Sequence, residues 1–293
     1  MTKTAIIMSR NDNYGGNLEL RAIYCLNSMV DPFDEVIYVD WNSREDKGTL
    51  IDKIKTNLRK TGKLRTITIK PDEAFKFVNK DSTAQPCCEV LGRNIAIRRA
   101  TSDWIVSTNI DIVPPKILDF SKLDKNTFHT VSRKLFMDTG MYAKEKPLDF
   151  FLDDSEDFFE NIPHEDTNKL REEFSKLNLP HKQPRNDISL VDCCGDFQIA
   201  HKDLWYNIRG FEESMIYRGK TDTNVQLKSH GHGFNLKLLM PQDIEVTHIG
   251  HLSFGEDGGG KDIVSRNPDF GPDKTKNPET WGFSNINFKE EII

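Results

Sequence analysis

Short apolar runs alternate with amphipathic segments through the first 111 residues, and this alternation restricts the fold more than any other feature of the chain. The apolar runs have the length of strands, and the segments between them carry apolar residues at helical spacing. The expected strands are residues 4–8, 35–40, 64–70 and 103–111, and the expected helices are 17–30, 47–60 and 88–100. Strand alternating with helix predicts an α/β fold with a mixed, mostly parallel sheet flanked by helices.

Composition narrows the class of protein. A chain of 293 residues can bury a sizeable core, and a formal net charge of −6 argues against nucleic acid as the main partner. Two adjacent cysteine pairs, Cys87-Cys88 and Cys193-Cys194, lack the spacing of a zinc site and favour reduced thiols. Residues 1–9 resemble a first strand more than a signal peptide, and no apolar run reaches the length of a membrane span. We therefore expect a cytoplasmic protein without a membrane span.

Two segments differ from the rest of the chain. Residues 149–173 are strongly acidic with interleaved phenylalanines, which fits either a solvated helical excursion or an insertion that borders an acceptor site. The segment from Gly255 onwards is rich in glycine and proline, and it could be a lid or a frayed terminus. We expect a single domain over residues 1–254 with an acidic insertion at about 139–187, followed by a flexible tail or lid over 255–293.

Polar residues follow three of the expected strands. They are Ser9 to Asp12, Asp40 to Ser43 and Asn109 to Asp111. In sheets of this kind, ligands bind beyond the carboxyl ends of the strands, so these clusters mark a candidate site. Asn109 and Asp111 are separated by one residue and should point to the same side of the strand, where their oxygen atoms would suit Mg²⁺ or Mn²⁺. An aspartate before a proline-rich turn is also common turn chemistry, and that alternative stays open.

Three other positions allow two interpretations each. If the strand before His248 and His251 continues, these histidines face opposite sides, so one of them could reach a metal while the other is structural. Asp222 precedes a candidate helix and could cap it or act as a general base. Arg93 could be a solvated charge or a ligand of a diphosphate.

Taken in order, these segments resemble the nucleotide-sugar glycosyltransferases of the GT-A fold, in particular the family-2-like group and the galactosyltransferase carboxyl-terminal module. The matching pieces span most of residues 4–251. They are IIMSRND, EVIYVDWNS, LGRNIAIRRATSDWIVSTNIDIVPP, GDFQIAHKDLWYNIRGFEE, GKTDTNVQLKSHGHGF and THIGH. The resemblance implies a Rossmann-like GT-A domain that binds a nucleotide-sugar donor.

For the donor nucleotide, the resemblance implies five positions. Arg10, Asn11 and Asp40 would hold the nucleoside, with Trp41 nearby, and Arg93 would lie near the diphosphate. All five lie in the segments that match the first half of the family's fold.

For the metal, the resemblance places Asn109-Ile110-Asp111 at the family's Asp-x-Asp motif. Asp111 would then bind Mn²⁺ or Mg²⁺, and His251, or with less support His248, would be the late metal ligand. Asn109 replaces the first acidic residue of the motif and removes one negative charge. Because its carbonyl can still coordinate the metal or bind the ribose, we expect a weaker metal affinity and keep Asn109 among the donor-binding residues.

For the acceptor side, the resemblance assigns Gly195, Asp196 and Phe197 to the sugar or acceptor, and Asp222 to the general base. Thr221 replaces the glutamate that usually precedes this base. The expected activity is metal-dependent transfer of a sugar from a donor expected to be UDP-linked. The acceptor is a hydroxyl of a glycan, a lipid-linked sugar or a protein, and the expected stereochemistry is inversion. A retaining transferase, a nucleotidyltransferase and a non-catalytic module that binds nucleotide sugars or glycans are the alternatives.

Overall fold

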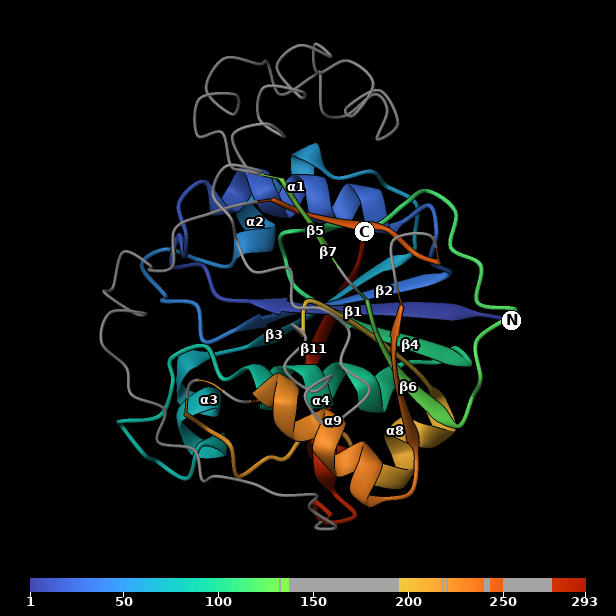
Figure 1. Cartoon of the computed structure of the whole chain (residues 1–293). Helices are drawn as coiled ribbons and strands as arrows, with labels where there is room; N and C mark the ends of the chain where they lie inside the picture. The colour runs from blue at the N-terminus through green and yellow to red at the C-terminus, as the bar shows by residue number, and fades with distance from the viewer. Residues whose placement is uncertain (132, 137–194, 218, 220, 240–242, 250–275) are drawn as a thin grey trace, which may run out of the picture.

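An eight-stranded sheet forms the centre of the computed structural model, which describes residues 1–131, 133–136, 195–217, 219, 221–239, 243–249 and 276–293 (Figure 1). Its strands are β1 (Lys3–Ser9), β2 (Glu35–Trp41), β3 (Leu64–Ile69), β4 (Trp104–Thr108), β6 (Thr127–Val131), β8 (Phe197–His201), β9 (Asn235–Leu239) and β11 (Lys289–Ile292). Their order is β11-β3-β2-β1-β4-β8-β6-β9. Strands β3, β2, β1 and β4 are parallel, whereas β8 and β11 are antiparallel to their neighbours. The predicted mixed, mostly parallel sheet is therefore confirmed.

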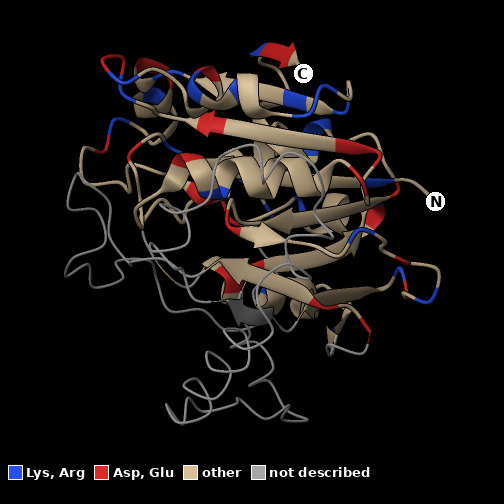
Figure 2. Cartoon of the chain, turned by 90° about the horizontal axis from the view of Figure 1, so that it is seen from above, with Lys and Arg blue, Asp and Glu red and all other residues tan. Residues whose placement is uncertain are grey.

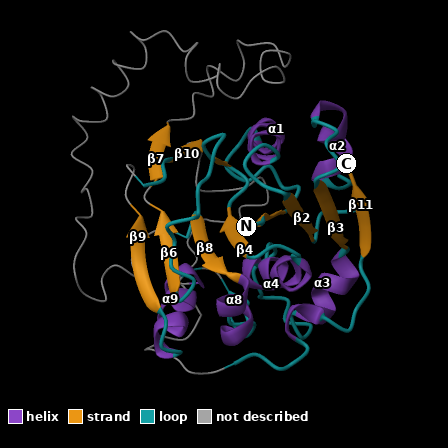
Figure 3. Cartoon of the chain, turned by 90° about the vertical axis from the view of Figure 1, so that its right-hand side faces the viewer, coloured by secondary structure: helices purple, strands orange, loops and turns teal. Residues whose placement is uncertain are grey.

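Helices cover both faces of this sheet (Figure 3). One face carries α1 (Leu18–Met29) and α2 (Leu50–Ile54), which continues into the 3₁₀ turn η1 (Lys55–Asn57). The other face carries α3 (Pro71–Phe77), α4 (Glu89–Arg99), α8 (Lys202–Ile208) and α9 (Thr221–Gly231). A second, three-stranded sheet has the order β5-β10-β7, with β5 (Ile112–Val113), β10 (Val246–Ile249) and β7 (Arg133–Phe136). This second sheet lies on the same side as α1 (Figure 3).

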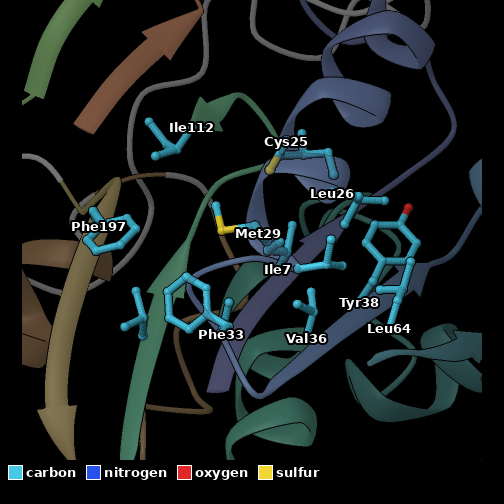
Figure 4. Close-up of a cluster of buried hydrophobic side chains, with 14 of the residues drawn as sticks. Ile7, Cys25, Leu26, Met29, Phe33, Val36, Tyr38, Leu64, Ile112 and Phe197 are labelled. Atoms are coloured by element: carbon cyan, nitrogen blue, oxygen red, sulfur yellow. The ribbon is translucent and has the colours of Figure 1, made fainter. Parts of the chain in front are cut away.

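Two hydrophobic clusters fill the two layers. On the α1 side, Leu26 and Met29 pack with Phe33, Val36 and Tyr38 (Figure 4). The cluster on the other side includes three tryptophans, Trp41, Trp205 and Trp281, each at most 1% exposed. Since strands β1, β2 and β4 contribute side chains to both clusters, one sheet joins the two cores into a single folded unit.

The strand expected over residues 103–111 is shorter than predicted. Strand β4 ends at Thr108, and the amide of Ile112 donates to the carbonyl of Asn109 at 3.3 Å, which closes a turn over Asn109 to Asp111. The chain then enters the second sheet, where Ile112 pairs with His248 of β10. Asn109 and Asp111 therefore lie in a turn between two sheets, and the expected alternation of side chains along a strand does not apply to them.

Other elements also differ from the expectation. The helix expected over residues 47–60 is limited to α2 and η1, which end at Asn57. It begins only at Leu50, because Thr49 caps it by accepting a hydrogen bond from the amide of Asp52 at 3.1 Å. Helix α3 was not expected; Pro71 occupies its first turn, where a missing amide hydrogen costs nothing.

Residues 276–293 belong to the segment expected to be a flexible tail or lid, yet they pack on the body. Trp281 is 1% exposed, and the side-chain amide of Asn277 donates to the carbonyl of Arg209 at 2.7 Å. Strand β11 pairs with β3. The expected flexibility is therefore wrong for residues 276–293. Residues 255–275 and the insertion expected at about 139–187 lie outside the described residues.

Charged side chains of both signs are interspersed over the same elements (Figure 2).

Within the described residues, no helix combines the length and the apolar character needed to cross a membrane. Cys25, Cys87 and Cys88 are free thiols, as expected; Cys193 and Cys194 lie outside the described residues.

Candidate active site

Asn109 is held between two charged side chains where β4 ends. Its side-chain oxygen accepts a hydrogen bond from the Arg93 guanidinium at 2.5 Å, and its side-chain nitrogen donates to Oδ1 of Asp196 at 2.7 Å. An aspartate at position 109 could not donate to Asp196, and it would place two carboxylates in contact. The structure thus gives a physical reason for asparagine at the first position of the motif.

Arg93 binds the side chain of Asn109 from helix α4. The side chain lies in helix α4, is 3% exposed, and donates to Oγ of Ser107 at 2.6 Å as well as to Asn109. Its guanidinium lies 5.5 Å from the ring centroid of Phe211, within the range of a cation–π contact. In this structure Arg93 is used to orient Asn109, and its role toward a diphosphate stays a prediction.

Asp111 lies between Arg21 and His248. Its Oδ2 atom is 3.2 Å from Nη1 of Arg21, and its Oδ1 atom is 3.7 Å from Nε2 of His248. All three residues are buried, with exposures of 5% for Asp111, 2% for Arg21 and 8% for His248. Strand β10 places the histidine here, since the amide of Ile249 donates to the carbonyl of Asp111 at 2.8 Å.

These side chains meet part of the requirement for a divalent cation. A carboxylate oxygen and an imidazole nitrogen that face each other are ligands that Mn²⁺ accepts. No group of three or more histidine, cysteine, aspartate or glutamate side chains that could hold a metal occurs in the part of the chain that the structure describes, and His251 lies outside that part. The described donor set therefore fits a cation whose remaining ligands are supplied by groups such as water or a bound phosphate.

Gly195 and Asp222 are packed directly against each other. A Cβ atom added to Gly195 would lie 2.0 Å from both Cγ and Oδ1 of Asp222, so only glycine fits beside this carboxylate. Asp222 is the second residue of α9 and not its cap. Its Oδ1 atom is buried and accepts no hydrogen bond within the described residues. This oxygen thus lies buried against Gly195, and the contact holds the Asp222 carboxylate in a defined position.

Asp196 connects the two parts of the site. It follows Gly195, is 7% exposed, and binds Asn109 through its side chain. Its carbonyl also accepts a hydrogen bond from Oγ1 of Thr108 at 2.7 Å. The neighbouring Phe197 is completely buried in the core on the α1 side, which makes it a packing residue and not part of an open sugar or acceptor site.

The residues expected around the nucleoside are less open than predicted. Trp41 is 1% exposed, and its ring centroid lies 6.3 Å from that of Phe77, so it belongs to the core and does not face an open site. Asp40 is also 1% exposed; its Oδ2 atom accepts hydrogen bonds from the amide of Leu50 at 2.8 Å and from the Tyr38 hydroxyl at 3.3 Å. Burial raises the pKa of the Asp40 carboxyl to about 6.

Arg10 and Asn11 lie in the loop after β1. Arg10 donates to the carbonyl of Asn42 at 2.9 Å, and the amide of Asn11 donates to Oγ of Ser43 at 2.8 Å. Asn11 lines a cavity of about 630 Å³ that Lys47 and Lys53 also line, whereas Asp40 lines a different cavity of about 300 Å³. The structure thus brings together Asn109, Asp111, Asp196 and Asp222, with His248, but it does not gather the expected nucleoside residues around one cavity.

The sequence analysis did not identify Arg21, although its position on the apolar face of the expected helix could have indicated it. Arg21 lies three residues after Leu18 and four before Cys25, on the apolar face of α1. A charged residue on that face requires a buried partner of opposite charge, and the partner is Asp111.

Comparison with known proteins supports the fold. No protein-family model matches the chain, and no curated protein matches it in sequence. The solved structure of S. aureus TarS 1-349 in complex with UDP-GlcNAc is similar with a TM-score of 0.50 and 14% identity, covering 90% of this chain and 62% of that one. GalNAc-T7 with UDP, GalNAc and Mn²⁺ is similar with a TM-score of 0.50 and 11% identity, covering 86% of this chain and 43% of that one. The chain thus spans less than two thirds of the length of either protein. These similarities confirm the predicted GT-A fold.

Proposed function

We propose that this protein is a glycosyltransferase that moves a sugar from a nucleoside-diphosphate sugar, UDP-linked, to an acceptor hydroxyl. The GT-A fold supports a nucleotide-sugar donor, and two proteins that share it were solved with UDP-GlcNAc or with UDP, GalNAc and Mn²⁺. A fold alone hosts several activities, so the proposal depends on the site.

The observation that carries the proposal is the connection from Asn109 through Asp196 to Asp222. Asn109 binds Asp196, and Gly195, which precedes Asp196, packs directly on Asp222. This arrangement couples the residues at the end of β4, where a donor phosphate would lie, to a carboxylate that Gly195 holds in a defined position. A transferase needs these two features side by side, because the acceptor must attack while the diphosphate leaves.

In the proposed mechanism, Asp222 accepts the proton of the acceptor hydroxyl as the hydroxyl oxygen bonds to the anomeric carbon. The bond from this carbon to the diphosphate oxygen breaks on the opposite face, so the configuration inverts. Asp196 and Arg93 hold Asn109 in a fixed orientation toward the donor. This fixed geometry lowers the entropic cost of bringing donor and acceptor together.

Asp111 and His248 would hold the divalent cation, together with His251. When bound, Mn²⁺ or Mg²⁺ neutralises the negative charge that develops on the departing diphosphate. Asn109 would bind the cation or the ribose through its side-chain oxygen, which also accepts the hydrogen bond from Arg93.

The test is a calorimetric titration of UDP, GDP and CMP, each with and without Mn²⁺. We expect UDP to bind, and to bind more tightly with Mn²⁺. The bound nucleotide then selects the UDP sugars for an assay of transfer, in which the anomeric configuration of the product separates an inverting enzyme from a retaining one. Binding of none of the nucleotides, with or without metal, would refute the proposal.

A further inference from the structure

We propose that Arg21 is a positioning residue that makes cation binding at Asp111 depend on the nucleotide; this inference rests on the proposed function. Arg21 has no role in the mechanism above. It is the buried cation beside the candidate metal ligand, and its guanidinium lies 3.2 Å from Oδ2 of Asp111.

The three-way contact of Arg21 fixes the orientation of Asp111. Its Nε atom donates to the carbonyl of Gly16 at 3.1 Å, and its Nη2 atom donates to the carbonyl of Tyr14. Its Nη1 atom donates to Oδ2 of Asp111. Arg21 thus faces Oδ2 and His248 faces Oδ1, so the two oxygens of the Asp111 carboxylate have different neighbours.

The charges of the site indicate when a cation can bind. Asp111 and Arg21 carry opposite charges, and so do Asp196 and Arg93, which both bind Asn109. Asp222 adds one negative charge. The formal sum of these five charged side chains is −1, whereas a site that retains a divalent cation by itself carries several negative charges. Arg21 is 2% exposed, so water does little to weaken the repulsion between its guanidinium and a metal ion at Asp111.

A bound nucleoside diphosphate would make the charge around Asp111 more negative and so favour a cation there. Its phosphate oxygens add negative charge and further ligands, so cation and nucleotide should each raise the affinity of the protein for the other. Arg21 also binds the loop after β1 through Tyr14 and Gly16, so the same side chain links that loop to Asp111.

The test measures free Mn²⁺ by electron paramagnetic resonance during titration of the protein, first with Mn²⁺ alone and then with UDP present. A parallel titration of UDP without protein corrects for the Mn²⁺–UDP complex. We expect wild-type protein to bind Mn²⁺ alone weakly and UDP to raise that affinity by about 10-fold or more, within the usual range of coupling between sites.

Three variants separate the role of Arg21 from a structural one. Arg21→Gln removes the charge but can still donate to Asp111, and we expect it to bind Mn²⁺ alone about tenfold more tightly, with a smaller effect of UDP. Arg21→Lys keeps the charge and should bind Mn²⁺ alone as weakly as wild type. Arg99→Gln removes another partly buried arginine that holds backbone carbonyls, far from Asp111, and should leave Mn²⁺ binding unchanged.

A purely structural role would weaken Mn²⁺ binding in Arg21→Gln, so a loss or no change of affinity in the folded variant overturns the inference. Equal tightening in Arg21→Lys also overturns it. If Arg21→Gln does not fold, the wild-type titration decides, because equal Mn²⁺ affinity with and without UDP contradicts the inference. Failure of UDP to bind to the wild type in any condition counts against the proposed function instead, and the measurements with Mn²⁺ alone still judge the role of Arg21.

Discussion

Single residues determine the chemistry of this site, and Asp222 is the first to test. Its buried Oδ1 atom accepts no hydrogen bond within the described residues, and asparagine has the same shape without the ability to take a proton. We expect Asp222→Asn to lower kcat by about 10²- to 10⁴-fold, the usual contribution of a general base, with UDP affinity in the presence of Mn²⁺ nearly unchanged. Steady-state kinetics and calorimetry measure the two effects. Equal losses of turnover and of UDP affinity would contradict the assignment.

Gly195 should act through Asp222. A methyl group at position 195 would lie 2.0 Å from Cγ of Asp222, so Gly195→Ala must displace the carboxylate. We expect a fall in kcat similar to that of Asp222→Asn. In the double variant the two effects should not add, because residues in contact are coupled. A kcat for the double variant equal to the product of the two single losses would show that Gly195 acts elsewhere.

Asp40 should make stability depend on pH. Its pKa rises from 3.8 in the unfolded chain to about 6 in the folded protein, so the folded state prefers the protonated form. The stability this gives is complete below about pH 4 and is lost by about pH 6, a loss of about 3 kcal/mol when the shift is converted to free energy. Asparagine can still accept the hydrogen bond from Leu50 but does not titrate.

The measurement is urea unfolding of wild type and Asp40→Asn at about pH 4 and about pH 7.5. As the pH rises, the free energy of unfolding of the variant should increase relative to that of the wild type. A difference between the two proteins that is the same at both pH values would contradict the burial of an ionised Asp40.

The limits of prediction at this scale come from contacts between distant residues. Sequence patterns indicated Asn109, Asp111 and Asp222 as candidates. They could not show that Asn109 must donate to Asp196, 87 positions further along the chain. The pairing of Arg21 with Asp111 is equally distant, at 90 positions, and only the packing of α1 against the end of β4 creates it.

Among the elements, the segment from residue 276 differs most from its expected behaviour. Glycine and proline content indicated flexibility, but Trp281 fills a gap between α4 and α8, where its ring centroid lies 5.4 Å from that of Tyr206. Arg99 of α4 donates to the carbonyls of Gly282 and Phe283 at 2.8 and 3.0 Å. Composition describes the tendency of an isolated segment, whereas a single buried tryptophan and its backbone contacts decide whether the segment packs.

Trp281→Ala should therefore destabilise the whole protein. Truncation of a buried aromatic side chain costs about 3–5 kcal/mol, and Trp281 is 1% exposed. Phe75→Ala on α3 is the control, since Phe75 is 46% exposed and should cost far less. Urea unfolding of both variants checks the difference. A midpoint for Trp281→Ala close to that of Phe75→Ala would show that this segment is not bound to the body in solution.

On the scale of the whole molecule, the alternation of strand and helix was enough to predict a mostly parallel α/β sheet and the four strands β1, β2, β3 and β4. It did not predict their order, β3-β2-β1-β4. The other half could not be predicted, because β8, β6 and β9 are joined by pairings between segments far apart in the sequence. For example, Thr108 pairs with Phe197. The spacing of apolar residues carries no information about which distant strand lies next to which.

Because one sheet carries both hydrophobic cores, destabilising one core should lower the stability of the other by the same amount. Leu26→Ala truncates a side chain that is 1% exposed on the α1 side and should cost about 2–5 kcal/mol. Three of the four tryptophans lie in the cluster on the opposite side, so intrinsic fluorescence reports mainly on that layer. We expect its unfolding transition to shift by the same amount as the loss of secondary structure measured by circular dichroism. A fluorescence transition that stays in place would mean that the two layers unfold separately.

Strand β11 has a consequence for how molecules of this protein meet one another. It lies at the edge of the sheet and carries exposed Lys289, Glu290 and Glu291, whereas its neighbour β3 is the β-branched run LRTITI. An uncovered strand of that kind is a template for pairing with another chain, and short charged edge strands prevent such pairing. By occupying this edge, the segment that also packs Trp281 into the core shields the protein from self-association, so its local detachment would favour aggregation before global unfolding.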